Sequence, residues 1–423
     1  MVTLDSAAPA SRAGIWRNRN FVILVSGQFV SQAGNTLFTM AVYWFVLSTT
    51  GSRSDLGFVG SVLSLAGLGG LVAGALVDRW NRRRTMIWTD VTRSALALAL
   101  TVVAAAHGVP LPLLVAVVFA MGLVGQLFGP AEMALIPTVV PDAQLMAANS
   151  VNQGGTAIAQ LFGASLGGVI LGVFGPVILF GFNGVALAVS VASLLLLRLP
   201  AAAQVGAGAD AGPGVAARRL LTDIVQGQKA IWGSPFLRRG VPITLIVNFA
   251  LSPITFLDVA WVRQVLHLGA AVYGLFGVAI LVGILIGSVL AGSLGDRPSL
   301  PPILLSCFGA AGLAIAALSR VPVAVPDLAF LAVFGLSVGI LNTVLQSALQ
   351  RAVPDRLRGR VFGTLTAFGT MAYPLGGLLT GLAAAVTSVG NIFLGAGVLL
   401  AAASLLVLGL PSRISIDDTV EVA

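Results

Sequence analysis

Two long apolar segments are joined by Gly74-Ala75-Leu76-Val77-Asp78-Arg79-Trp80-Asn81-Arg82-Arg83-Arg84. The segment before this connection begins near Leu56, and the segment after it begins near Met86. The connection carries one carboxylate and four guanidinium groups and is too short to form a domain. Such a connection is typical of two antiparallel membrane helices, and its positive charge favours the cytoplasmic side.

The composition excludes an ordinary soluble globular protein. Mean hydropathy is +1.00, 57% of the residues are hydrophobic and 9% are charged, whereas soluble domains carry about 25% charged residues. The apolar residues occur in runs of about 20 or more, which is the length a helix needs to cross a bilayer core of about 30 Å. We therefore expect an all-α membrane protein.

The same composition argues against several other classes of protein. The net charge of +8 does not indicate a nucleic-acid partner, because the basic residues lie between apolar runs. One cysteine and two widely separated histidines predict no metal site, and we expect no cofactor. Phosphate-binding loops and zinc-protease motifs do not occur in the sequence, so we do not expect an enzyme.

Twelve apolar segments predict twelve transmembrane helices, with bends or tilts where a segment exceeds the bilayer thickness. They cover approximately 21–46, 55–77, 86–107, 111–136, 148–172, 175–197, 241–262, 270–294, 301–319, 326–349, 359–385 and 388–410. With the N-terminus inside, nineteen of the 23 basic residues lie in cytoplasmic segments, and only Arg53, Arg263 and Arg320 lie in outer ones. This bias predicts a multi-pass protein of the bacterial cytoplasmic (inner) membrane with both termini in the cytoplasm.

The second half of the chain repeats landmarks of the first half. Gly292-Ser293-Leu294-Gly295-Asp296-Arg297 echoes the core of the opening connection, with the two aspartates 218 positions apart. Val140-Pro141-Asp142 matches Val353-Pro354-Asp355. These repeats predict two pseudo-symmetric six-helix bundles, over 1–197 and 241–423. Residues 198–240 would form a cytoplasmic linker whose segment 218–232 is either a helix on the membrane surface or a solvated helix.

These residues carry a family resemblance over essentially the whole chain. Gly74-x-x-x-Asp78-Arg79-x-x-Arg82-Arg83 resembles the loop 2–3 signature of the major facilitator superfamily. Asn18-Arg19-Asn20-Phe21, Phe128-Gly129-Pro130-Ala131 and the segment 353–361 resemble the twelve-span drug:proton antiporters of the macrolide- and siderophore-exporter branch. The resemblance implies a monomeric secondary active transporter with a small-molecule substrate and protons as partners. It would export drug-like or siderophore-like amphipathic compounds by alternating access in the lipid bilayer.

Two other functions stay open at this point. One is an uptake permease or facilitator, and the other is a transporter-like sensor that binds a ligand without moving it. The segment 161–168 lacks the proline that exporters of this superfamily often carry in span five, which leaves the direction of transport open.

The opening connection and its echo are candidates for a cytoplasmic gate. The resemblance implies that Asp78 pairs with Arg82 and faces the start of span eleven near Gly359 when the protein is open to the outside. The predicted gate residues are Gly74, Asp78, Arg79, Arg82, Arg83, Asp296 and Arg297. Alternatively, these charges only set the topology.

Ionisable residues inside apolar spans are costly and are therefore functional candidates. Glu132 and Asp258 have no obvious local partner, so we predict that one of them binds the coupling proton, or that they are structural charges. Asp90 and Arg93 lie three positions apart, which favours a structural pair on one helix face.

Polar residues at helical spacing predict the lining of a central cavity. Gln28, Ser31, Gln32 and Asn35 follow the i, i+3, i+4, i+7 pattern, and Asn248 and Thr255 lie half a chain later. Helix–helix hydrogen bonding is the alternative for this set. The aromatic side chain of Phe256 is a further candidate for contact with an apolar substrate.

Overall fold

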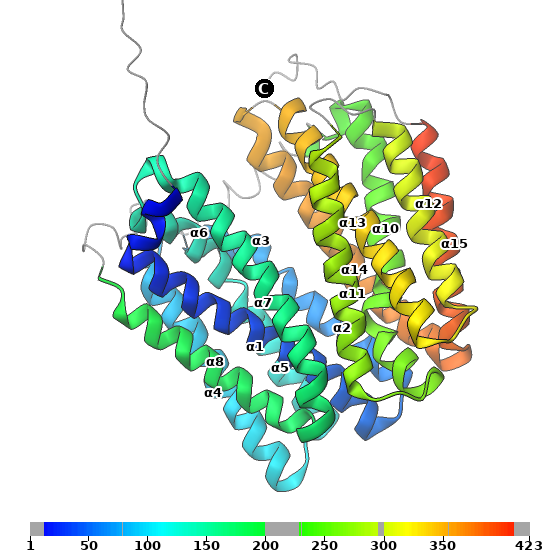
Figure 1. Ribbon diagram of the computed structural model, residues 1–423, viewed down its shortest axis with the longest axis horizontal. Helices are drawn as coiled ribbons and strands as arrows, with labels where there is room; N and C mark the ends of the chain where they lie inside the picture. The colour runs from blue at the N-terminus through cyan, green and yellow to red at the C-terminus, as the bar shows by residue number, and fades with distance from the viewer. Residues whose placement is uncertain are drawn as a thin grey trace, which may run out of the picture.

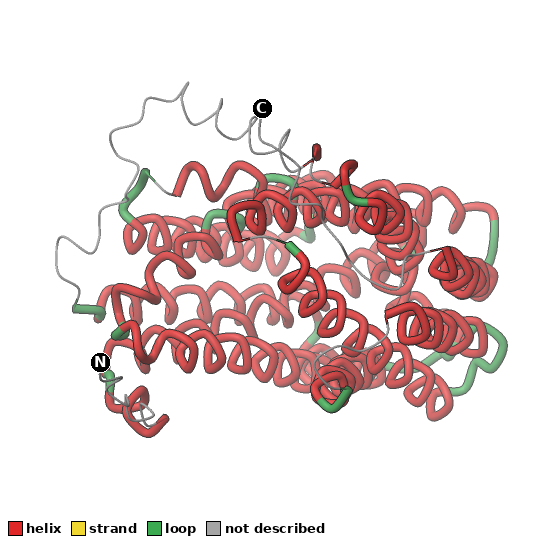
Figure 2. Tube along the Cα trace, turned by 90° about the horizontal axis from the view of Figure 1, so that it is seen from above, coloured by secondary structure: helices red, strands yellow, loops and turns green. Residues whose placement is uncertain are grey.

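Helices make up almost all of the chain that the computed structural model describes, which is residues 12–77, 79–198, 228–229, 231–294, 300–353 and 355–409 (Figures 1 and 2). No strand occurs among these residues. The α-helices are α1 Arg19–Thr50, α2 Arg53–Gly67, α3 Gly70–Val77, α4 Arg82–His107, α5 Leu111–Gly125, α6 Phe128–Val139, α7 Leu145–Phe174, α8 Pro176–Leu196, α10 Pro235–Ala260, α11 Ala270–Gly292, α12 Leu300–Leu318, α13 Ala324–Ala352, α14 Asp355–Val386 and α15 Val389–Leu406. A π-helical turn, Trp261–Val265, extends α10.

Side-chain caps and glycines set several helix ends. The side chains of Asn18, Ser52 and Asn81 accept hydrogen bonds from backbone N–H groups in the first turns of α1, α2 and α4. Gly51 and Gly175 follow α1 and α7 with φ angles of 66° and 75°. These angles favour glycine, so both residues end their helices at defined positions.

Two of the predicted spans are interrupted. The segment 55–77 consists of α2 and α3, which separate at Leu68 and Gly69. The segment 111–136 consists of α5 and α6, which separate at Gln126 and Leu127. Pro130 explains the second break, because it has no N–H group to donate to the carbonyl of Gln126. The bends predicted from segment length therefore occur as breaks at specific residues.

The described helices identify the chain as a multi-pass membrane protein. Ten helical segments are long and apolar enough to cross a bilayer. α1 has 32 residues but carries a polar stripe, and it is not among the ten. α2 and α3, with 15 and 8 residues, are each too short to be counted. Each predicted span coincides with a helix or helix pair, which confirms the all-helical architecture and leaves the number of crossings a prediction.

The helices pack in two groups that follow the order of the chain. We call residues 12–198 the N-half and residues 231–409 the C-half. In the N-half α1 packs against α7 and α8, and in the C-half α11 packs against α13 and α12 against α15. The main contacts between the halves join α2 to α14 and α7 to α11. Figure 1 shows that the two groups converge at one end and lie apart at the other.

Glycines allow the halves to approach closely where they meet, which we call the closed end. A Cβ atom on Gly168 would lie 2.8 Å from the Cα of Gly274, and one on Gly57 would lie 2.5 Å from the Cα of Gly381. Small residues of this kind bring membrane helices into backbone contact. The opposite end, where the ribbons diverge in Figure 1, is the open end.

Candidate functional site

A polar pocket lies within the N-half and brings several predicted residues together. It has a volume of about 250 Å³, and α1 contributes all four residues of the predicted polar stripe. Arg93 of α4 and Glu132 of α6 line the same space. The residues that line this N-half pocket are Gln28, Ser31, Gln32, Asn35, Arg93, Met121, Gly122, Gly125, Gln126, Phe128, Gly129 and Glu132.

A hydrogen-bond network connects this pocket to α8. Arg93 Nη2 donates to Asn35 Oδ1 at 2.7 Å, and Arg93 Nη1 lies 3.6 Å from Asp90 Oδ1. Ser190 Oγ donates to Asp90 Oδ2 at 2.6 Å and accepts from Gln28 Nε2 at 3.5 Å. Asp90 and Arg93 are therefore more than a local pair on one helix, because they join α1, α4 and α8.

Glu132 has one oxygen that the protein does not satisfy. Asn152 of α7 lies close enough to influence the carboxylate electrostatically. Glu132 Oε1 is buried and has no hydrogen-bond partner among the described residues. The same is true of Arg93 Nε. A buried carboxylate oxygen without a partner is costly as an anion. It is therefore suited to bind a proton or a hydrogen-bond donor from a ligand.

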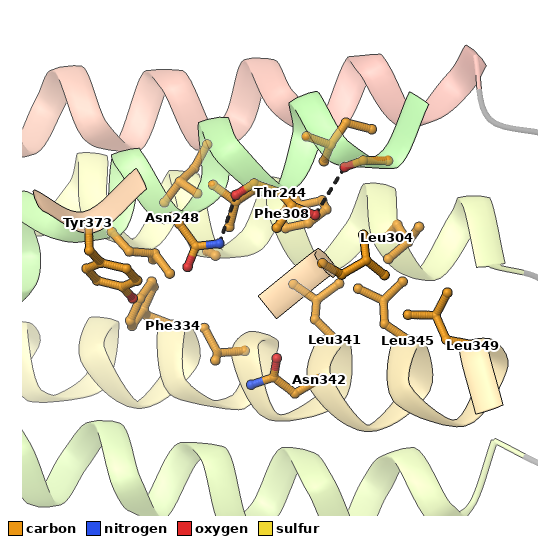
Figure 3. Close-up of a pocket in the computed structure, with 18 of the residues that line it drawn as sticks. Thr244, Asn248, Leu304, Phe308, Phe334, Leu341, Asn342, Leu345, Leu349 and Tyr373 are labelled. Atoms are coloured by element: carbon orange, nitrogen blue, oxygen red, sulfur yellow. Dashed lines mark hydrogen bonds between the residues drawn. The ribbon is translucent and has the colours of Figure 1, made fainter. Parts of the chain in front are cut away.

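The C-half presents a second polar surface. A pocket of about 350 Å³, which we call the C-half pocket, lies between α10, α13 and α14. Its polar residues include Asn248, one of the candidate cavity residues, together with Thr244, Asn342, Gln346 and Tyr373. Asn248 Nδ2 donates to the backbone carbonyl of Thr244 at 2.8 Å (Figure 3).

The remaining α10 candidates lie elsewhere. Thr255 is exposed and donates to the carbonyl of Leu251 at 3.2 Å. Phe256 is buried at the closed end, where its ring centroid lies 6.1 Å from that of Tyr43. Asp258 Oδ1 accepts from the N–H of Val259 at 2.7 Å. The structure thus places Asn248 in a pocket and Phe256 at the contact between the halves.

Polar and aromatic contacts cross between the halves at the closed end. Gln264 binds the Arg53 side chain and donates to the carbonyl of Gly51 at 3.2 Å. The guanidinium of Arg263 lies 5.2 Å from the centre of the Trp44 ring, an arrangement typical of a cation–π contact. Trp44 in turn stacks on Tyr273 with centroids 6.1 Å apart.

With this geometry established, comparison with known proteins identifies the family. The family model described as Major Facilitator Superfamily matches residues 24–366 and 254–417. The chain belongs to the major facilitator superfamily. It is consequently a membrane transporter rather than an enzyme. Among the described residues, no three His, Cys, Asp or Glu side chains form a group that could hold a metal ion.

Relatives within the superfamily include drug exporters. The multidrug efflux pump Tap of Mycolicibacterium fortuitum is 27% identical over 384 residues, covering 85% of this chain and 88% of Tap. Tap of Mycobacterium tuberculosis is 29% identical over 385 residues, covering 86% of this chain and 88% of its own. Macrolide efflux protein A of Streptococcus pyogenes is 22% identical, covering 90% of this chain and 93% of its own.

Solved structures of the superfamily share the fold. The nucleoside transporter NupG aligns with a TM-score of 0.72 and 13% identity, covering 93% of this chain and 100% of its own. The D-xylose–proton symporter aligns with a TM-score of 0.67 and 15% identity, covering 93% of this chain and 98% of its own. At these identities the likeness extends to the fold alone.

The gate residues expected from the superfamily signature are described only in part. Arg82 Nη1 donates to the carbonyl of Ala134 at 3.0 Å, and Arg83 Nε donates to the carbonyl of Leu194 at 2.8 Å. These bonds tie the start of α4 to the middle of α6 and to the end of α8 within the N-half. Gly74 lies in α3, and Arg79 lies in the turn that follows it. Asp78, Asp296 and Arg297 lie outside the described residues, so the gate stays a prediction.

Two buried polar residues of α8 were not predicted as site residues from the sequence. Ser190 and Asn183 of α8 are both fully buried, and Ser190 completes the network around Asp90. They are polar residues seven positions apart in an otherwise apolar span, the same helical spacing that revealed the stripe on α1. That signal was available in the sequence.

Proposed function

We propose that this transporter exports drug-like or siderophore-like amphipathic compounds in exchange for protons. The export of such compounds is supported by the relatives Tap and macrolide efflux protein A, which are named as efflux proteins. In this proposal the monomer has twelve transmembrane helices in two six-helix bundles, 1–197 and 241–423, joined by the cytoplasmic linker 198–240. Both termini lie in the cytoplasm of a bacterium, and the protein resides in the cytoplasmic membrane.

The observation that carries the proposal is the pair of polar pockets, one in each half. The N-half pocket and the C-half pocket are lined by α1 and α10, the first long helix of each half. The halves meet through glycines at the closed end and separate at the open end (Figure 1). This arrangement supports alternating access, in which the bundles rock about a substrate site between them.

The direction of opening follows from the charges. Arg82 and Arg83 lie in the basic connection, which the positive-inside bias assigns to the cytoplasm. On this assignment, we infer a state that is open to the cytoplasm and closed to the outside. In the opposite state, Asp78 with Arg82 would close against the start of α14.

Glu132 is the residue to which we assign proton coupling. Its unpartnered Oε1 in the N-half pocket would bind a proton in one state and release it in the other. Desolvation penalises the charged carboxylate, so opening and closing of the pocket changes how readily it holds the proton. Asp258, the other candidate, accepts a backbone hydrogen bond from Val259 and lines neither the N-half pocket nor the C-half pocket.

Reconstitution in liposomes with an imposed pH gradient tests this function. Lipophilic dyes and antibiotics should move against their own gradient only when the pH gradient is present. Movement that is indifferent to the pH gradient would indicate a facilitator and reject proton coupling. No movement of any compound would indicate a sensor. Replacement of Asp78 by Asn should impair transport while the protein stays in the membrane, and unimpaired flux would reject the gate.

A further inference from the structure

A deeper apolar cavity lies inside the C-half. It has a volume of about 320 Å³ and is enclosed by α10, α12, α13, α14 and α15. We call it the C-half recess. None of the residues that line it in the described chain is charged. Its apolar walls include Leu304, Phe308, Ala311, Phe334, Val338 and Leu341.

The recess adjoins the C-half pocket through a polar rim. The polar residues Thr244, Asn248, Asn342 and Tyr373 line both spaces, and so do Leu345, Leu349 and Leu365. Figure 3 shows Asn248 and Asn342 on opposite sides of the space. A compound in the C-half pocket would therefore reach the recess by passing these polar side chains.

The rim has hydrogen-bonding groups that the described protein leaves free. Asn248 uses its Nδ2 for the carbonyl of Thr244, which leaves its Oδ1 as an acceptor. The Asn342 amide and the Tyr373 hydroxyl make no hydrogen bond within the described chain. Polar groups in a mostly apolar pocket are the usual means by which a protein orients a small ligand.

We propose that the C-half recess binds the apolar ring portion of the transported compound, while Asn248, Asn342 and Tyr373 bind polar substituents at its edge. This inference rests on the export function proposed above. Leucine and phenylalanine walls favour an apolar group, because its transfer from water is favourable. A charged group would lose its hydration there without a compensating partner. The charged part of an amphipathic compound is therefore kept outside the recess, on the side of the N-half.

Filling the recess tests the proposal. Val338 of α13 is a partly buried wall residue, and its replacement by Phe would occupy space that is empty. Val333 of the same helix is 45% exposed and lines neither the recess nor the C-half pocket. Val333→Phe is therefore a matched control for the same change in side chain.

The probe is dansylcadaverine, an amphipathic dye whose neutral naphthalene ring system is separate from its charged amine, and its binding to purified protein is followed by fluorescence polarisation. Val338→Phe should raise the dissociation constant about tenfold, because the ring loses its buried apolar surface. Val333→Phe should bind as the parent does. Parental affinity in Val338→Phe, or a parent that does not bind the dye, would overturn the proposal.

A thiol-protection experiment covers the case in which Val338→Phe does not fold. Val338→Cys is a small change, and Cys307→Ala removes the one native cysteine. Bound dansylcadaverine should slow the reaction of the new thiol with methyl methanethiosulfonate about tenfold. An unchanged reaction rate at saturating dye would place the ring elsewhere and overturn the proposal.

The failure of this inference can be told apart from failure of the export function. If Val338→Phe weakens dye binding but liposomes with the parental protein do not move the dye, the result supports ring binding in the recess and rejects the export function. If liposomes with the parental protein move the dye, and Val338→Phe neither weakens its binding nor slows its transport, the result supports the export function and rejects ring binding in the recess.

Discussion

The N-half pocket and the C-half recess differ in the chemistry of their walls. The N-half pocket is lined by Gln28, Asn35, Arg93 and Glu132, and an extended hydrogen-bond network supports it. Leucine and phenylalanine dominate the recess, and its described lining carries no charge. The two halves share repeated sequence motifs, yet the walls of their cavities differ in polarity and charge.

This difference has a physical cause. A charge inside a membrane protein needs partners on neighbouring helices, so the N-half devotes side chains of α1, α4 and α8 to Asp90 and Arg93. An apolar cavity needs no partners and costs only the lost packing contacts of its walls. The N-half is therefore suited to hold a proton and the C-half to hold an apolar group.

The largest expected effect comes from breaking the charge pairing of the N-half. Arg93→Met leaves Asp90 buried with Ser190 as its remaining described partner, and it should lower the free energy of unfolding by about 3 kcal/mol. Equilibrium unfolding in detergent micelles measures this loss. The exposed Arg84 on the same helix provides the control Arg84→Met, which should change stability by less than about 0.5 kcal/mol.

The double variant Asp90→Asn with Arg93→Met sharpens that test. Removing both charges should restore part of the lost stability, because no uncompensated charge is then buried. A double variant that is as unstable as Arg93→Met alone would show that packing, rather than pairing, is what Arg93 contributes.

Replacing Glu132 with Gln tests whether coupling resides in the N-half. The variant keeps the shape of the side chain but cannot release a proton, so pH-driven dye transport should fall about tenfold or more. Dye binding by fluorescence polarisation should stay near the parental value, because the recess is untouched. Asp258→Asn, which alters the C-half carboxylate, should reduce pH-driven dye transport less than Glu132→Gln does. Parental transport in Glu132→Gln would move the coupling site out of the N-half pocket.

A smaller effect is expected where the two halves touch. A methyl group on Gly168 would lie 2.8 Å from both the Cα of Gly274 and the carbonyl oxygen of Ala270, whereas one on Gly172 would have no neighbour closer than 3.9 Å. Gly168→Ala should weaken the closed end and slow transport about fivefold. Gly172→Ala on the same helix should transport as the parent does. Equal rates for the two variants would mean that this contact does not limit the cycle.

The sequence predicted the fold and one wall of the site well. Apolar runs located each helix, because a bilayer imposes a length and a hydropathy that appear directly in the residues. The stripe of Gln28, Ser31, Gln32 and Asn35 was predicted to share one surface, and the structure places all four in one pocket. Their role in transport stays a prediction.

The recess could not be predicted from the sequence. Leu304, Phe308 and Leu341 have the residue types of any packed core, and whether they enclose space depends on how five helices pack. The partners of Asp90 and Arg93 also depended on tertiary structure, because Ser190, which binds Asp90, and Asn35, which binds Arg93, are far from them in the chain. Predicting the break before α6 would have required setting the effect of Pro130 against the unbroken apolar run around it.

Distances between spin labels at the two ends of the molecule test alternating access most directly. In a Cys307→Ala background, Met146→Cys and Leu294→Cys label exposed sites on α7 and just after α11, near the open end. Val173→Cys and Val325→Cys label exposed sites near the closed end. On adding dansylcadaverine and shifting the pH, the open-end distance should shorten while the closed-end distance lengthens. Two distances that stay fixed, or that change in the same direction, would contradict the rocking of one half against the other.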